Sequence, residues 1–87
     1  MMENYCIYIL FSLKLNKYYV GYTSNLETRM IKHLSVHKGY TGQIADWKVV
    51  YREQYGSKAD AIRREKEIKG WKSRKMIEKL IVLKTQE

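Results

Sequence analysis

Residues 5–11, YCIYILF, and residues 18–23, YYVGYT, are two runs of aromatic and aliphatic residues joined by the turn-like stretch 12–17, SLKLNK. Residues of these types favour extended, pleated strands. Because the connection between the two runs is short, they are predicted to pair as one antiparallel β-hairpin. The hairpin decides the fold, since the later segments have to pack against it.

The segments after the hairpin are predicted to form one more strand and three helices. Ser24 opens a Ser-x-x-Glu capping box before the first helix, and residues 47–53, WKVVYRE, have the composition of a third strand. Ser57 is a candidate cap for a helix that runs to about Trp71, and Ser73 is a candidate cap for the last helix. The expected fold is α+β, a small three-stranded and mainly antiparallel sheet flanked by helices. Its order is strand, strand, helix, strand, helix, helix.

Composition limits what this chain can be. Its 87 residues, of which 45% are hydrophobic, suit one globular domain spanning 1–87. The apolar stretches are too short to cross a membrane, and nothing at the start resembles a signal peptide, so we expect a cytoplasmic protein. We also favour a monomer. A single cysteine, Cys6, excludes an internal disulfide and a cysteine-based zinc finger. The net charge of +8 favours a polyanionic partner.

Glu65 is the most unusual residue of the predicted helix after Ser57. At about 100° per residue it falls in the middle of an apolar arc formed by Ala61, Ile62 and Ile68. A carboxylate there is unfavourable unless it is paired or binds a metal. Both interpretations stay open: a glutamate at the edge of the core with a basic neighbour, or a metal or catalytic ligand.

Arg29 and His33 are separated by one helical turn and leave the same side of the first predicted helix. His33 shares the face of Leu26 and Met30, which points to the sheet. The structural alternative is an inward histidine with one hydrogen bond and a solvated arginine beside it.

Alternation along the strands separates the tyrosines. Tyr18 and Tyr22 share one face of the second strand, whereas Tyr19 and Gly21 share the other. Gly21 leaves room beside Tyr19 for another backbone or a phosphate. Tyr8, on the first strand, can converge with Tyr19 if the hairpin forms. Most of the eight tyrosines are nevertheless expected to serve packing.

These residues, taken in order, resemble the signature of the GIY-YIG endonuclease superfamily: Tyr8, Tyr19-Val20-Gly21, Arg29, His33 and Glu65. The stretch 60–71 is similar to the small, single-domain bacterial branch of that superfamily. The likeness extends from about Tyr5 to Leu83. Cys6 stands where glycine is usual in the family, and Val20 replaces isoleucine; the tyrosines that carry the chemistry are kept.

The resemblance implies a role for each of these residues. Glu65 would be the metal ligand, holding Mg²⁺ or Mn²⁺ together with water. Tyr8 would help to deprotonate the attacking water, and Tyr19 would orient that water or a phosphate oxygen. Arg29 would neutralise the scissile phosphate, and His33 would tune the acidity of the active tyrosine. The implied activity is metal-dependent hydrolysis of phosphodiester bonds in nucleic acid, with DNA favoured and repair or recombination as a candidate setting.

A basic segment follows Ser57 and supplies the candidate contacts to nucleic acid. These are Arg63, Arg64, Lys66, Lys69, Lys72 and Arg74. Contacts to phosphates would give low sequence specificity and a steep salt dependence. Two other classes stay open: a nucleic-acid-binding module with weak or lost catalysis, and an interaction protein whose basic face, with Trp47, Trp71 and Tyr40, meets an acidic partner.

Overall fold

The computed structural model describes residues 4–34 and 46–85, with the side chains of 32–34 and 84–85 excepted. Its strands are β1 (Tyr5–Ser12), β2 (Lys17–Thr23) and β3 (Lys48–Tyr55). Its helices are α1 (Leu26–Leu34), α2 (Lys58–Gly70) and α3 (Arg74–Thr85). The predicted α+β fold and the predicted order of elements are confirmed.

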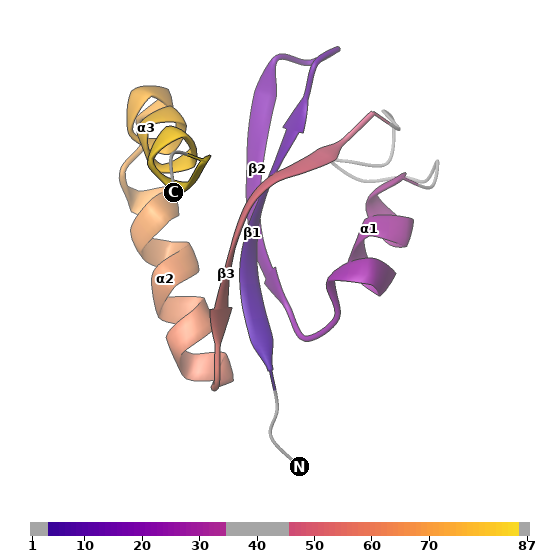
Figure 1. Cartoon of the computed structure of the whole chain (residues 1–87), viewed down its shortest axis with the longest axis vertical. Helices are drawn as coiled ribbons and strands as arrows, with labels where there is room; N and C mark the ends of the chain where they lie inside the picture. Colours follow the sequence, from indigo (N-terminus) through magenta and orange to yellow (C-terminus); the bar gives the residue numbers. More distant parts are fainter. Residues whose placement is uncertain (1–3, 35–45, 86–87) are drawn as a thin grey trace.

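The sheet has the order β2-β1-β3, and β1 pairs with both neighbours in antiparallel fashion. Helix α1 lies on one face of this sheet, and α2 and α3 lie on the other (Figure 1). The molecule therefore has three layers, with β1 in the centre. This explains why residues 6–10 are buried on both sides of the strand.

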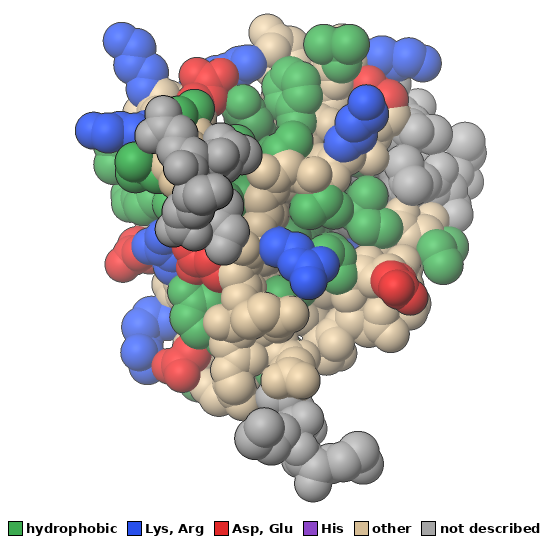
Figure 2. All heavy atoms as spheres, in the orientation of Figure 1, with side chains coloured by type: hydrophobic (Ala, Val, Ile, Leu, Met, Phe, Trp, Pro, Cys, Tyr) green, Lys and Arg blue, Asp and Glu red, His purple; other side chains and the backbone are tan. Residues whose placement is uncertain are grey.

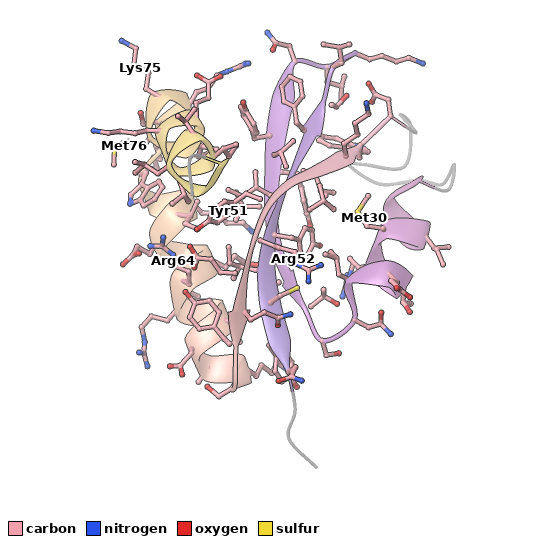
Figure 3. The ribbon with its side chains drawn as sticks, viewed as in Figure 1. Met30, Tyr51, Arg52, Arg64, Lys75 and Met76 are labelled. Atoms are coloured by element: carbon pink, nitrogen blue, oxygen red, sulfur yellow. The ribbon has the colours of Figure 1, made fainter. Side chains whose placement is uncertain are left out.

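Two hydrophobic clusters fill the spaces between the layers. On the side of α2 and α3 the buried cluster consists of Ile7, Ile9, Val20, Tyr51, Ala61 and Ile68. On the side of α1 it consists of Tyr8, Leu10 and Trp47, against which Tyr19, Leu26 and Met30 pack. Figure 3 shows Tyr51 between the sheet and α2, and Met30 between the sheet and α1. The predicted alternation of the tyrosines on β2 is thus confirmed.

The predicted cap of α1 was wrong by one residue. The side chain of Asn25, rather than Ser24, accepts a hydrogen bond from the backbone N–H of Thr28 at 3.1 Å. Asn25 is among the best capping residues, so a start at Leu26 satisfies the first turn equally well. Ser57 and Ser73 cap α2 and α3 as predicted, each accepting from the N–H three residues later.

Trp47 does not belong to an exposed patch, which corrects one expectation. It is 2% exposed and is one of the largest buried side chains among the described residues. Its position directly before β3 turns it inwards, under α1. Tyr40 lies outside the described residues. Within residues 4–34 and 46–85, no helix is both long enough and apolar enough to span a membrane.

Candidate active site

Tyr8 and Tyr19 converge on the α1 face of the hairpin. Tyr8 on β1 lies opposite Gly21 on β2, so Tyr19 is the next residue on the same face of β2. The two ring centroids are 6.4 Å apart, with the ring planes at 33°. The convergence that the hairpin made possible is therefore present.

Position 21 requires glycine because the neighbouring side chains leave no room for a Cβ atom. A Cβ atom at this position would lie 2.6 Å from the Tyr8 hydroxyl oxygen and 3.1 Å from Cε1 of Tyr19. Its φ is not positive, so the backbone itself does not demand glycine. The missing side chain is what lets the two phenol rings occupy the same corner of the sheet.

Arg29 and Glu65 reach the same corner from helices on opposite faces of the sheet. A cavity of about 400 Å³ is lined by Tyr8 and Tyr19 from the strands, Arg29 from α1 and Glu65 from α2. Because β2 is an edge strand, side chains of the α1 layer and the α2 layer can meet around its free edge. The structure thus brings together four of the five predicted catalytic residues. The fifth, His33, belongs to α1, but its side chain lies outside the described residues, as does His37.

Lys58 was missed by the sequence analysis. It lines the same cavity, together with Tyr5, Tyr22, Thr23 and Ser24. The signal that could have identified it is its spacing: Lys58 precedes Glu65 by seven residues on α2, two turns along the same helix face. The cavity accordingly holds two cations, Arg29 and Lys58, beside one carboxylate.

Burial dominates the acidity of Tyr8. The ring is 1% exposed, and burial raises the pKa of the phenol; the neighbouring Tyr19 and Glu65 raise it further, while the Arg29 guanidinium lowers it. The Tyr8 hydroxyl therefore keeps its proton at neutral pH unless positive charge is added nearby. Arg29 is the described residue that acts in that direction.

Glu65 has the chemistry of a single-carboxylate site for a hard cation. Its side chain is 14% exposed, and its ion-pair partner is Lys69, with Nζ 3.5 Å from Oε1. The described residues contain no group of three or more His, Cys, Asp and Glu side chains that could enclose a metal. This set does not suit zinc, which takes several nitrogen or sulfur ligands, but it fits Mg²⁺, which keeps most of its water and uses one or two carboxylates.

Tyr19 packs against the residue that directly precedes β3. The buried Trp47 meets its ring edge-on, with centroids 6.3 Å apart. The preceding residue, Asp46, accepts hydrogen bonds from Ser12 Oγ at 2.7 Å and from the Lys14 N–H at 2.9 Å. Both hydrogen bonds lower the pKa of Asp46, and the bond from the Lys14 N–H has the larger effect. The hairpin turn and the entry to β3 are therefore tied together beside the candidate site.

Two of the predicted nucleic-acid contacts are occupied within the protein. Arg64 binds Glu53 through Nε at 3.0 Å and Nη2 at 3.1 Å, and it also pairs with Glu67. Arg74 binds the carbonyl and side-chain oxygens of Asn16 at 2.8 and 2.7 Å, and its guanidinium lies 5.2 Å from the ring centroid of Tyr18. Both guanidinium groups fasten helices to the sheet.

The other predicted basic contacts lie at the surface. Arg63 is 78% exposed and pairs with Asp60 at 3.3 Å. Lys66, Lys69 and Lys72 are exposed, and Lys69 makes the ion pair with Glu65. On the face drawn in Figure 2, Lys and Arg side chains are spread among Asp and Glu rather than gathered in one patch. Contact with a polyanion would therefore depend on which cations adjoin the cavity.

Comparisons with known proteins show the family to which the chain belongs. Residues 4–79 match the GIY-YIG catalytic domain family, a family of nucleases, and the chain belongs to that family. It is 41% identical over 70 residues to a UPF0213 protein of Staphylococcus haemolyticus, covering 78% of this chain and 83% of that protein. It is 34% identical over 77 residues to a UPF0213 protein of Staphylococcus saprophyticus, covering 87% and 93% of the two chains.

A solved structure shares the fold. The solution NMR structure of a UPF0213 protein from Bacillus halodurans is 34% identical and superposes with a TM-score of 0.61. The match covers 93% of this chain and 85% of that one. The chain is therefore a small member of the GIY-YIG family, similar to UPF0213 proteins over most of its length.

Proposed function

We propose that the protein is a divalent-metal-dependent endonuclease that hydrolyses phosphodiester bonds in DNA with low intrinsic sequence specificity. The observation that carries the proposal is the cavity at the edge of β2, where two phenols, a guanidinium and a carboxylate meet from four different elements. Membership of the nuclease family supports it.

Arg29 and Lys58 supply the phosphate contacts in this proposal. A guanidinium presents two parallel N–H donors that match two phosphate oxygens, and an ammonium adds a point charge. Charge develops on the phosphate oxygens as the water attacks, and fixed cations in a partly enclosed cavity stabilise it. Arg29 is half-buried, which strengthens its effect compared with an arginine in open water.

Tyr8 and Tyr19 position and deprotonate the attacking water. Tyr8 Oη can accept a proton from the water only as a phenolate, after it has lost its own proton, and burial disfavours that form by holding the pKa above the ordinary value. Arg29 lowers this pKa, and so would the cation that Glu65 binds. Tyr19, whose ring is half-buried, orients the water or a phosphate oxygen. The proposal keeps His33 as the residue that tunes the active tyrosine.

Glu65 would hold the metal, Mg²⁺ or Mn²⁺. Once bound, such an ion supplies positive charge to the leaving oxygen and increases the acidity of nearby water. Lys69 would have to give up its ion pair with Glu65, which is undemanding for an exposed lysine. Contacts to phosphates alone would leave sequence preference low. A cytoplasmic monomer acting in DNA repair or recombination is the setting that we propose.

A plasmid-nicking assay tests the function. Supercoiled DNA is incubated with the protein in Mg²⁺, in Mn²⁺ or in EDTA, beside Glu65→Ala and the control Glu67→Ala. We expect nicking with either metal, none in EDTA, and a loss on the order of a thousand-fold or more for Glu65→Ala, since the metal contributes several kcal/mol. Glu67, exposed and paired with Arg64, should tolerate alanine.

The same assay decides between the proposal and a binding module. DNA binding in a filter assay, with no nicking in either metal, would favour the binding module. Glu65→Ala nicking as fast as the parent would show that the metal site lies elsewhere.

A further inference from the structure

A second cavity adjoins the candidate active site. It has a volume of about 430 Å³ and lies along β2 where α2 passes into α3. Val20, Ile68 and Ile77 are among the residues that line it. A space of this size is in the range of small-molecule sites, which span roughly 300–1,000 Å³.

The two cavities share a wall. Tyr19 lines both of them. Lys69 lines the second cavity, and its ammonium group lies 3.5 Å from Glu65, which lines the first. A chain whose phosphate sits by Arg29 and Glu65 would therefore have its next chemical group within reach of the second cavity.

The lining of the second cavity is apolar inside and cationic outside. Lys17, Lys69 and Lys72, all exposed, contribute to its edge, and none of its lining residues is acidic. Arg74 also lines it, but its guanidinium is bound to Asn16 and fixes the hairpin turn to α3. An apolar interior with a cationic edge suits a flat, uncharged ring attached to an anionic backbone.

Lys72 occupies this edge in an unfavourable backbone conformation. Its φ is +49°, in the left-handed region that glycine adopts readily and a lysine does not. The turn between α2 and α3 would thus be easier to form with glycine there. A strained residue in such a place is a reason to look for a function of its side chain.

We propose that this second cavity binds the base of the nucleotide adjacent to the scissile phosphate, with the lysines at its edge contacting the neighbouring phosphates. The inference rests on the proposed function, because it takes DNA as the substrate. It adds a base subsite that is selective for the presence of a base and not for its identity, since apolar contact and ring stacking are tolerant of sequence.

Methyl NMR tests base binding directly. The protein is titrated, without divalent metal, with a single-stranded DNA octamer and with an octamer of abasic residues that carries the same phosphates. We expect the methyl signals of Val20 and Ile77 to shift with the first ligand and much less with the second. The methyl groups of Leu13 and Val82, exposed and outside the cavity, should not shift.

The outcomes separate this inference from the proposed function. Shifts near Arg29 with unchanged Val20 and Ile77 signals would overturn the base subsite and leave DNA binding standing. Equal shifts with both octamers would also overturn it, since phosphates alone would then explain them. No shift at any position would count against DNA binding itself, and so against the proposed function.

A variant at Lys72 tests the edge of the cavity. Lys72→Gly removes the charge and relieves the backbone, so the melting temperature should stay level or rise while affinity for the DNA octamer falls roughly three- to tenfold. The control Lys75→Ala removes an exposed lysine of α3 that points away from the sheet, and it should change affinity less than about twofold. Equal effects of the two variants would remove Lys72 from the proposed subsite.

Discussion

The same combination of four side chains, two tyrosines, one arginine and one glutamate, occurs twice among the described residues. The first set is Tyr8, Tyr19, Arg29 and Glu65. The second set is Tyr51, Tyr55, Arg64 and Glu53. Their compositions are identical, so the difference between them shows what makes a set of residues a site.

In the second set, the closed set, the polar groups satisfy one another. Glu53 accepts hydrogen bonds from the hydroxyl groups of Tyr51 and Tyr55, the latter at 2.5 Å, and two more from Arg64. Both carboxylate oxygens and most of the guanidinium are therefore occupied between β3 and α2. The hollow beside Tyr55 and Arg64 is smaller, about 230 Å³, and is also lined by Asp60 and Glu67, which would repel a phosphate.

In the first set, the open set, the side chains line a cavity. They come from β1, β2, α1 and α2, and the ion-pair partner of Glu65 is an exposed lysine. Side chains of the two helix layers meet around the free edge of β2 and line a cavity of about 400 Å³. The arrangement, and not the residue types, is what places these side chains around a cavity that a ligand can enter.

The largest expected effect separates the two pairs of tyrosines. Phenylalanine keeps the ring and removes the hydroxyl. Tyr8→Phe and Tyr19→Phe should each lower the nicking rate by about a hundred- to ten-thousand-fold, as is typical of a lost general base, with little change in stability. Tyr55→Phe should leave nicking intact and lower the free energy of unfolding by about 1–2 kcal/mol, because a hydrogen bond to a carboxylate is lost.

Tyr18→Phe is the control for position. Its hydroxyl donates to Glu78 at 3.2 Å on the other face of β2, so nicking should not change. A Tyr55→Phe protein that loses nicking as completely as Tyr8→Phe would show that the closed set takes part in chemistry. Full activity in both Tyr8→Phe and Tyr19→Phe would assign those two rings to packing.

The members of the open set could be named from the sequence because simple periodicities single out some of them and the resemblance to the family supplies the rest. A period of two along β2 places Tyr19 and Gly21 on one face, and the hairpin places Tyr8 opposite Gly21. The helical period sets Glu65 apart from its charged neighbours. Their order along the chain resembles the signature of the family, and the structure adds that four of these residues share one cavity.

The closed set could not be predicted, because it depends on how α2 packs across β3. Arg64 and Glu53 belong to different elements, and nothing in the local pattern tells Arg64 from Arg63. The packing angle turns Arg64 inwards and leaves Arg63 in solvent. Lys58 was missed for a related reason: its spacing places it on the helix face of Glu65, but the spacing alone does not show that both side chains line one cavity.

The next effect concerns stability and its dependence on pH. Burial raises the pKa of Glu53, but the hydrogen bonds from Arg64, Tyr51 and Tyr55 outweigh it, so the pKa falls below the ordinary value of 4.5. The stabilisation from this carboxylate is therefore complete above pH 4.5 and is lost as the pH falls further. Burial and Glu53 raise the pKa values of Tyr51 and Tyr55 to about 12, so their contribution is lost as the pH rises from 10 to 12.

Urea unfolding over a range of pH measures these contributions. The parent should be most stable between about pH 5 and 9.5, within the two limits set by these pKa shifts. Glu53→Gln should lower the free energy of unfolding by about 2–3 kcal/mol at pH 7 and flatten the acid limb, because Arg64 loses its half-buried charged partner. Glu67→Gln, at an exposed ion pair, should cost less than about 1 kcal/mol. Similar losses in the two variants would mean that the closed set is no more than a surface network.

The smallest effect compares the cations beside the two sets. Lys58 adjoins the open cavity, whereas Arg63 borders the closed set and pairs with Asp60 at 3.3 Å. Each phosphate contact contributes about one unit to the slope of log K against log salt concentration, so Lys58→Ala should reduce the slope by about one. Arg63→Ala should reduce it by less, since Asp60 already offsets part of its charge. The measurement is fluorescence anisotropy of a labelled duplex from low to high salt. Equal reductions would indicate that DNA contacts both sides of α2, and they would contradict the proposal that the substrate binds at the open set.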